Sequence, residues 1–176
     1  KANLLFIFGT RPEAIKLAPL IIEFKARPEF NTLVCVTGQH REMLDQVLSF
    51  FEITPDYDLD IMMRDQTLFD VTSNALKKLE PVFNSAKPDC VFVQGDTTTA
   101  FVGALAAYYK KVQVAHIEAG LRSHNKYSPF PEEMNRTLAG NLPDFHITPT
   151  EQDGINLMNE NIRTNIFNVG NQCTLR

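Results

Sequence analysis

The stretch NLLFIFGTRPEAIKLAPLIIEFKA, residues 3–26, decides the fold. Its opening, NLLFIF, is apolar after the first residue and predicts a buried strand. Residues 12–26 carry apolar side chains too densely for one thin stripe, which indicates a helix packed closely on a sheet. Between them, Gly9 allows a tight turn, Thr10 can cap the helix and Pro12 suits its first turn. A strand that leads directly into a helix is therefore the first unit of the structure.

The rest of the chain repeats this alternation of apolar runs and amphipathic stretches. Strands that are apolar throughout and separated by helices imply a parallel sheet covered by helices on both faces. No internal repeat, low-complexity tract or linker interrupts the pattern, so residues 1–170 are expected to form one doubly wound, mainly parallel α/β domain. The predicted strands are residues 3–8, 32–37, 57–61, 90–95, 112–117, 145–148 and 166–170, and the predicted helices are residues 12–26, 40–51, 67–86, 97–110, 131–139 and 151–160.

Composition narrows the classes of partner. A chain of 176 residues can bury about 70% of its unfolded surface, and its net charge of -4 disfavours a nucleic-acid partner. No apolar run approaches the roughly 18–20 residues that span a bilayer and no signal-peptide pattern opens the sequence, so no membrane partner is expected. The scattered cysteines Cys35, Cys90 and Cys173 are typical of reduced cytosolic thiols rather than of a disulfide framework or a zinc site.

Three polar segments follow predicted strands at their carboxyl ends, where doubly wound sheets bind ligands. They read FGTRPEAIK, QGDTTTA and HIEAGLRS. In the first, Arg11 and Lys16 lie beside a predicted helix N-terminus, where two cations suit an anionic ligand better than they suit the helix dipole. The same segment can also be ordinary helix-start sequence. No G-x-G-x-x-G or P-loop motif occurs, so nicotinamide binding and ATP hydrolysis lack support.

Acidic residues gather at the same edge of the predicted sheet. Asp96, which follows Gly95 at a strand end, can cap the next helix or present a carboxylate that takes a proton or holds a sugar hydroxyl. Glu118 lies just past another strand. Glu132 and Arg136 are four residues apart on one helix face, so they can form a surface salt bridge or both point into a cleft. The convergence of Asp96, Glu118 and Glu132 on one edge favours acid–base chemistry.

Other polar residues carry weaker signals. His116 lies within a predicted strand, where a core histidine is expected. Gln39, His40 and Arg41 follow another strand, so they can line the cleft or simply begin a helix. Glu133 belongs to a first helical turn, where an acidic side chain complements the dipole without any further function. No pair of histidines has ligand spacing with a nearby cysteine or aspartate, so no metal site is expected.

Taken together, the segments GTRPEAIKLAPLI, TGQHREMLDQVLSFFEI, DLDIM, QGDTTTAF, HIEAGLRS and PFPEEMNR resemble the N-terminal domain of non-hydrolysing UDP-N-acetylglucosamine 2-epimerases. The resemblance extends from Asn3 to about Gly170, and the segments occur in the family's order. It implies one half of an enzyme with two Rossmann-like domains, similar to GT-B glycosyltransferases, that binds the nucleotide sugar between them.

The resemblance also implies a reaction and roles for residues. The family interconverts UDP-N-acetylglucosamine and UDP-N-acetylmannosamine for bacterial surface polysaccharides, through elimination of UDP to a 2-acetamidoglucal and re-addition with the C2 proton on the opposite face. Asp96, Glu118 and Glu132 match its acid–base carboxylates. Positions that bind the diphosphate or support the site are matched by Arg11, Lys16 and Arg136. No cofactor and no metal are implied.

Further expectations follow from the same resemblance. Residues 171–176 would begin an interdomain linker or form an altered tail, a C-terminal nucleotide-binding domain would lie beyond them, and the fragment alone would have little or no activity. The full-length protein would be a cytoplasmic homodimer that binds UDP-N-acetylglucosamine and UDP. Gln39, His40 and Arg41 match part of a region that binds a second, activating UDP-N-acetylglucosamine. The alternatives are a hydrolysing epimerase and a non-catalytic binding module.

Overall fold

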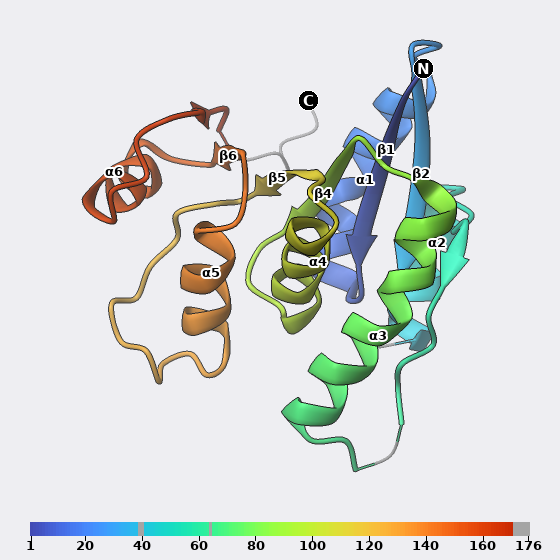
Figure 1. Cartoon of the computed structure of the whole chain (residues 1–176), viewed down its shortest axis with the longest axis horizontal. Coiled ribbons are helices and arrows are strands. Elements are labelled where there is room, and N and C mark those ends of the chain that lie inside the picture. The colour runs from blue at the N-terminus through green and yellow to red at the C-terminus, as the bar shows by residue number, and fades with distance from the viewer. Residues whose placement is uncertain (39–40, 64, 171–176) are drawn as a thin grey trace.

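A parallel β-sheet forms the centre of the computed structural model, which describes residues 1–38, 41–63 and 65–170 (Figure 1). Its strands are β1 Ala2–Phe8, β2 Phe30–Val36, β3 Tyr57–Asp58, β4 Cys90–Gln94, β5 Gln113–Ile117, β6 Phe145–Thr148 and β7 Ile166–Asn168. Within the described residues each neighbouring pair is parallel, in the order β3-β2-β1-β4-β5-β6-β7. The order steps outward from β1 on one side and from β4 on the other, so the predicted doubly wound topology is confirmed.

Helices connect the strands where the sequence pattern predicts them. They are α1 Arg11–Lys25, α2 Arg41–Phe50, α3 Leu68–Ala86, α4 Thr98–Tyr109, α5 Glu132–Gly140 and α6 Glu151–Asn159. The main difference from the predicted pattern is at β3, which is shorter than residues 57–61. Its paired register with β2 ends at Asp58, opposite the last residue of β2; the Leu59 N–H still donates to Val36, but Asp60 has a φ of 42° and leaves the extended region.

Each face of the sheet has its own apolar core. Side chains of β1 alternate between the two cores: Leu5 and Ile7 pack with α3 and α4, whereas Leu4, Phe6 and Phe8 pack with α1 and α2. Figure 1 shows α3 and α4 in front of the sheet. A strand buried on both faces needs apolar residues at consecutive positions, which is why NLLFIF lacks the alternation of a half-exposed strand.

Close packing of α4 on the sheet depends on its small residues. A Cβ atom added at Gly103 would lie 3.1 Å from Val93 of β4 and 3.4 Å from Ile7 of β1. Real Cβ contacts are rarely this short, so Gly103 sets how near the helix axis comes to the strands. The N-terminus of α4 is thereby held over the carboxyl end of β4.

The cysteines and the lengths of the helices bear on two predictions made from composition. Cys35 is buried, Cys90 is partly buried and both are free thiols, while Cys173 lies outside the described residues. Among the helices of the described ranges, none is long and apolar enough to cross a membrane.

Parallel pairing brings the polar segments that follow β1, β4 and β5 to one edge of the sheet. The N–H of Gly95 donates to the Ile117 carbonyl at 2.9 Å, and the N–H of Ala119 donates to the Ile147 carbonyl at 3.0 Å. The turns after β4 and β5 are therefore bonded to the neighbouring strand ends. They hold the residues that follow in place relative to one another.

The turn after β5 yields a prediction about stability. Gly120 has a φ of 91°, and an added Cβ would lie 2.2 Å from the Asp153 carbonyl oxygen, which is backbone and cannot rotate away. Gly95 has a similar φ of 70° but no atom within 4 Å of an added Cβ, so it is a matched control. We expect Gly95→Ala to lower the free energy of unfolding by about 1–2 kcal/mol. Gly120→Ala should lower it by about 1–3 kcal/mol more, through overpacking.

Urea denaturation of both variants beside the parent chain measures this difference. Equal losses would contradict the prediction, because they would mean that α6 moves aside without penalty.

Candidate functional site

Glu118 is the first residue after β5 and has a φ of 63°, a left-handed conformation that is uncommon for a residue with a side chain. The hydrogen bond from the Ala119 N–H to the Ile147 carbonyl of β6 holds this turn. Lys16 of α1 and Gln94 at the end of β4 both donate to Glu118 Oε2. Groups from α1, β4 and β5 therefore meet at one half-buried carboxylate. A strained backbone that its surroundings hold in place is common at functional sites.

Asp96 follows β4 and does not cap α4. The cap is Thr97, whose hydroxyl oxygen accepts the Ala100 N–H at 3.0 Å. The interpretation of Asp96 as a helix cap is therefore wrong, and its carboxylate is available to other groups. Arg136 of α5 donates to it, with 2.8 Å between Arg136 Nη2 and Asp96 Oδ2.

The charges around Asp96 change its affinity for a proton. Burial raises the pKa of the Asp96 carboxyl, and the nearby carboxylates of Glu132 and Glu118 raise it further. The cations of Arg136 and Lys16 act in the opposite direction, and the net effect is an increase. A carboxyl group with a raised pKa binds and releases a proton closer to neutral pH, as an acid–base group requires.

Arg136 has a side chain that is only 8% exposed and lies between two carboxylates. Its Nη1 is 3.4 Å from Glu133 Oε2, and among the described residues it pairs with Asp96 and Glu133 but not with Glu132. Of the two alternatives for Glu132 and Arg136, the salt bridge is not formed, because Arg136 turns toward the buried side of α5. Glu132 remains half-buried, near enough to raise the pKa of Asp96.

Glu133 has a structural role that the dipole argument did not predict. It is buried, and its carboxylate accepts the N–H groups of Ser123 at 3.0 Å and His124 at 2.9 Å. Burial acts against the charged form, yet these hydrogen bonds hold the pKa of Glu133 below its usual value. Glu133 therefore ties the loop after β5 to α5, and so to the helix that carries Arg136.

Sequence reasoning missed Glu13, which is 1% exposed at the start of α1. Its Oε2 accepts the N–H groups of Gly9 at 3.0 Å and Thr10 at 2.8 Å, and its Oε1 accepts the Thr97 hydroxyl at 2.7 Å. Burial raises the pKa of Glu13 despite these bonds. Thr10 and Glu13 have the T-x-x-E spacing of a capping box, a signal that was available in the sequence. The bond to Thr97 depends on tertiary packing.

The HIEAGLRS loop makes two further sets of hydrogen bonds, to α6 and to the residue that caps its C-terminus, and the sequence did not indicate them. Arg122, which is almost fully buried, donates to both carboxylate oxygens of Glu160 at 2.7 and 2.8 Å. The Asn156 amide donates to the Gly120 carbonyl at 3.0 Å. Paired hydrogen bonds of this kind fix a guanidinium in one orientation. The loop is therefore held from α5 and from α6.

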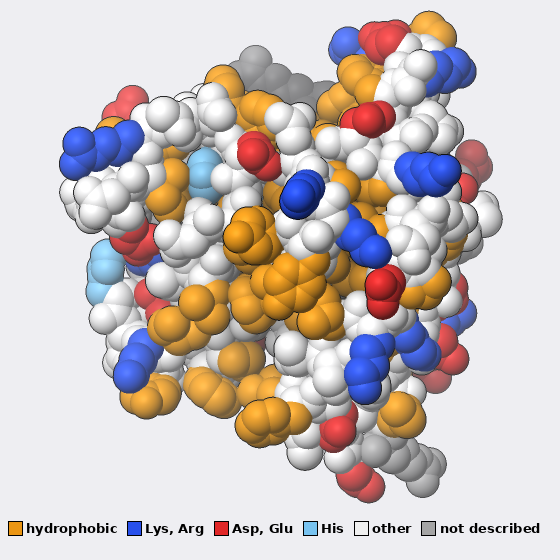
Figure 2. Space-filling model, in the orientation of Figure 1, with side chains coloured by type: hydrophobic (Ala, Val, Ile, Leu, Met, Phe, Trp, Pro, Cys, Tyr) orange, Lys and Arg blue, Asp and Glu red, His pale blue; other side chains and the backbone are white. Residues whose placement is uncertain are grey.

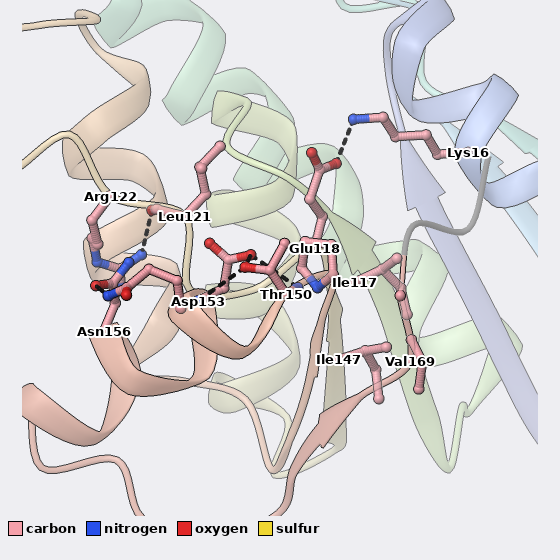
Figure 3. A pocket seen from close by; sticks show the side chains of 13 residues that line it. Lys16, Ile117, Glu118, Leu121, Arg122, Ile147, Thr150, Asp153, Asn156 and Val169 are labelled. Atoms are coloured by element: carbon pink, nitrogen blue, oxygen red, sulfur yellow. Dashed lines mark hydrogen bonds and ion pairs between the residues drawn. The ribbon is translucent and has the colours of Figure 1, made fainter. Parts of the chain in front are cut away.

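Two cavities open at this edge and share Lys16, Glu118 and Leu121 in their walls. Lys16, Asp96, Glu118 and Arg136 all contribute to the smaller one, of about 190 Å³, so the structure brings four of the expected site residues together. The larger, of about 470 Å³, extends toward α6 and appears in Figure 3 with the contact between Lys16 and Glu118 across its mouth. Carboxylates that face a cavity can exchange a proton with a bound ligand. Cations in the same wall can hold that ligand in place when it is an anion.

The remaining expected site residues lie elsewhere. Arg11 is exposed in the first turn of α1 and lines a separate hollow with Phe50 of α2. Arg41 pairs with Asp58 across a distance of 2.6 Å, which places it beside β3. Gln39 and His40 lie outside the described residues. In the described part of the chain, no cluster of histidine, cysteine, aspartate or glutamate could hold a metal ion.

The doubly wound sheet and its charged edge define a Rossmann-like domain, and solved structures of epimerases share it. A UDP-GlcNAc 2-epimerase from Neisseria meningitidis, whose structure was solved bound to UDP-GlcNAc, superposes with a TM-score of 0.94 at 52% identity, over 97% of this chain and 46% of that one. The fold alone is shared with the MurG protein of Acinetobacter baumannii, at a TM-score of 0.59 and 13% identity, over 85% of this chain and 42% of that one.

The chain belongs to the UDP-N-acetylglucosamine 2-epimerase family, whose model matches residues 22–174. It is 55% identical to the UDP-N-acetylglucosamine 2-epimerase of Bacillus subtilis over 172 residues, which cover 97% of this chain and 45% of that protein. An Escherichia coli K12 protein of the same name is 53% identical, over 96% of this chain and 45% of that protein. The chain spans about half the length of the curated relatives that it matches.

Arg136 lies between the partly exposed Asp96 and the buried Glu133, and the buried pair yields a prediction about stability. Arg136→Met would leave Glu133 charged and buried without its cation, so we expect the free energy of unfolding to fall by about 3–5 kcal/mol. Adding Glu133→Gln should recover part of the loss, since it removes the uncompensated charge. Arg27→Met is the control, because Arg27, just past the end of α1, pairs with Glu23 on the exposed surface and its loss should change stability little.

Denaturant titrations of the three variants and the parent chain give these energies. A loss for Arg136→Met no larger than that for Arg27→Met would contradict a structural role of the buried pair.

Proposed function

We propose that this chain is the N-terminal domain of a non-hydrolysing UDP-N-acetylglucosamine 2-epimerase, which interconverts UDP-N-acetylglucosamine and UDP-N-acetylmannosamine. Family membership supports the substrate class. The observation that carries the proposal is the single cavity lined by Asp96, Glu118, Lys16 and Arg136, since it offers acid–base groups beside cations suited to a diphosphate. The charged edge lies where doubly wound folds bind their ligands.

In the proposed reaction, carboxylates move the proton on C2. The C2–H is not acidic enough to be removed by itself, so the bond from C1 to the UDP oxygen breaks as a carboxylate takes the C2 proton. The products are 2-acetamidoglucal and UDP, and UDP then adds back to C1 as C2 receives a proton on the opposite face. Two faces require more than one acid–base group, and we assign these roles to Asp96, Glu118 and Glu132. The raised pKa of Asp96 supports its part.

Cations of the same edge are proposed to bind the diphosphate. Lys16 and Arg136 both contribute to the cavity, where Lys16 contacts Glu118 and Arg136 contacts Asp96. A charge placed between a carboxylate and the leaving diphosphate can stabilise both the bound substrate and the developing negative charge on UDP. Arg11, which is exposed in the first turn of α1 and lines a separate hollow, is proposed as a further diphosphate contact on the basis of the family resemblance alone.

The complete protein is proposed to have two domains, of which residues 1–170 are the first. Residues 171–176, which lie outside the described part, would begin the linker to a nucleotide-binding domain, and the span of about half of each relative supports this. We propose a cytoplasmic enzyme that needs no cofactor and serves bacterial surface polysaccharide synthesis. A second UDP-N-acetylglucosamine is proposed to bind near Gln39, His40 and Arg41.

The full-length protein is proposed to be a homodimer. Exposed apolar side chains gather on the face that carries α3 and α4, as Figure 2 shows, and supply a surface for self-association. Exposed aromatic residues of these helices are Phe69, Tyr108 and Tyr109. Phe69 lies at the start of α3 and the two tyrosines at the end of α4, so exposed apolar side chains are spread along this face, and exposed apolar surface can mark an interaction site.

Proton NMR of UDP-N-acetylglucosamine in D₂O tests the proposed function. We expect the full-length protein to form UDP-N-acetylmannosamine with deuterium at C2, and the 176-residue chain to form little or none because half of the cleft is absent. Release of free N-acetylmannosamine and UDP would instead identify a hydrolysing epimerase. Absence of exchange with both proteins folded would indicate a binding module, and efficient turnover by the fragment would contradict the need for a second domain.

Substitution of the proposed acid–base groups makes the assignment specific. In the full-length protein, Asp96→Asn, Glu118→Gln and Glu132→Gln should each lower kcat by about 10²–10⁴-fold, since each removes one positioned proton carrier. Glu80→Gln, on the exposed side of α3, is the matched control and should leave kcat unchanged. Thermal melts establish that every variant is folded. Near-normal turnover in all three site variants would refute the assigned roles.

A further inference from the structure

Asp96 lies between two residues that buried side chains hold in place. On one side, the Gly95 carbonyl oxygen is 2.7 Å from Nε2 of His116. On the other, the Thr97 hydroxyl donates to Glu13, as described above. The carboxylate itself contacts neither His116 nor Glu13 through a hydrogen bond or ion pair among the described residues. Arg136 holds the carboxylate directly, and the bonds to His116 and Glu13 hold the chain on either side of Asp96.

The protonation of His116 follows from its surroundings. The ring is fully buried in β5, and burial lowers its pKa to about 4, an effect to which the neighbouring His146 and Arg122 add. A neutral imidazole has one N–H, and a backbone carbonyl can only accept a hydrogen bond. The proton is therefore on Nε2, which donates to Gly95. Within the described residues Nδ1 has no hydrogen-bond partner, so the bond to Gly95 is the polar contact that the ring makes.

The hydrogen bond from His116 to the Gly95 carbonyl is important for the turn at Gly95, because few side-chain contacts hold this turn. Gly95 has no side chain, and no atom lies within 4 Å of the place where a Cβ would be, so no side-chain packing holds the turn on that side. Its N–H donates to the Ile117 carbonyl and its C=O accepts from His116, so both polar groups of Gly95 are bonded to β5. The next residues along β5 lead directly to Glu118. One strand thus sets the positions of both carboxylates that face the cavity.

We propose that His116 is a positioning residue of the reaction, one that aligns Asp96 with Glu118 by holding the Gly95 carbonyl. This inference rests on the proposed epimerase function. Without the Nε2 donor, the chain before Asp96 would lose one of its two bonds to β5, while Glu13 would still hold the chain after it. The backbone of Asp96 would then shift relative to Glu118 while Arg136 still holds the carboxylate, and the carboxylate would point in a different direction. A shift of about 1 Å in a reacting group can lower a rate about 10²-fold.

The test uses the full-length protein with substitutions at His116 and at a matched histidine. His116→Leu removes the donor from the buried site, whereas His116→Gln places an amide N–H near the former Nε2. His146 is the control, because it lies directly opposite His116 in the pairing of β5 with β6, is 3% exposed and also has an Nδ1 without a hydrogen-bond partner among the described residues.

We expect His116→Leu to lower kcat about 10- to 100-fold with KM changed less than about twofold. His116→Gln should recover most of kcat. His146→Leu should leave kcat unchanged even if it lowers the melting temperature as much as His116→Leu does. A kcat for His116→Leu equal to that of the wild type would overturn the proposal. Equal losses of kcat in His116→Leu and His146→Leu, with no recovery in His116→Gln, would also overturn it, because they would indicate a general effect of core damage.

The unsubstituted protein provides a second test that does not depend on folding of a variant. Long-range ¹H–¹⁵N NMR of the His116 ring should show a neutral Nε2–H tautomer from pH 8 down to pH 5. An Nδ1–H tautomer, or titration of the ring within this range, would overturn the proposal. Failure of the wild type to form UDP-N-acetylmannosamine would refute the proposed function instead, so the two failures are distinguishable.

Discussion

Parallel pairing of β1, β4 and β5 is the constraint on which the site depends. Because these strands run in the same direction, their carboxyl ends meet at one edge, and Lys16, Asp96 and Glu118 reach one cavity although they are far apart in sequence. The pairing in turn requires an apolar layer on each face of the sheet, and the alternating side chains of β1 supply both. The apolar side chains of β1 therefore form the core on both faces and, through the pairing that they stabilise, also align the site.

Buried ionisable groups support the half-exposed carboxylates of this edge. Glu13, Glu133 and Arg136 are nearly inaccessible to water, and such groups are tolerated only when hydrogen bonds or opposite charges compensate for lost hydration. Glu13 and Glu133 bond to the turns at this edge, whereas Arg136 donates to Asp96 and lines the cavity. Glu13 and Glu133 therefore hold the chain at this edge, while the buried Arg136 lines the cavity together with Lys16 and the two half-exposed carboxylates.

Much of the site was predictable because strand ends and charged residues are both visible in the sequence. Apolar runs locate the strands, and the parallel rule then places Asp96 and Glu118 at one edge. The partner of Arg136 was not predictable in this way. Spacing along α5 allows a bond to Glu132, but the rotation of the helix about its axis directs Arg136 toward Asp96 and Glu133, and only packing against α4 and the loop after β5 sets that rotation. The link between Glu13 and Thr97 was invisible for the same reason.

By itself, the sequence determined the alternation of strands and helices, the parallel sheet and the edge at which the polar segments gather, since each follows from local periodicity and from the burial of apolar runs. The tertiary structure alone decided which charges pair, which carboxylate is buried enough to have a raised pKa, and which nitrogen of His116 carries its proton. These properties depend on distances of a few ångströms between residues remote in the chain, and such distances are set by packing rather than by spacing along the sequence.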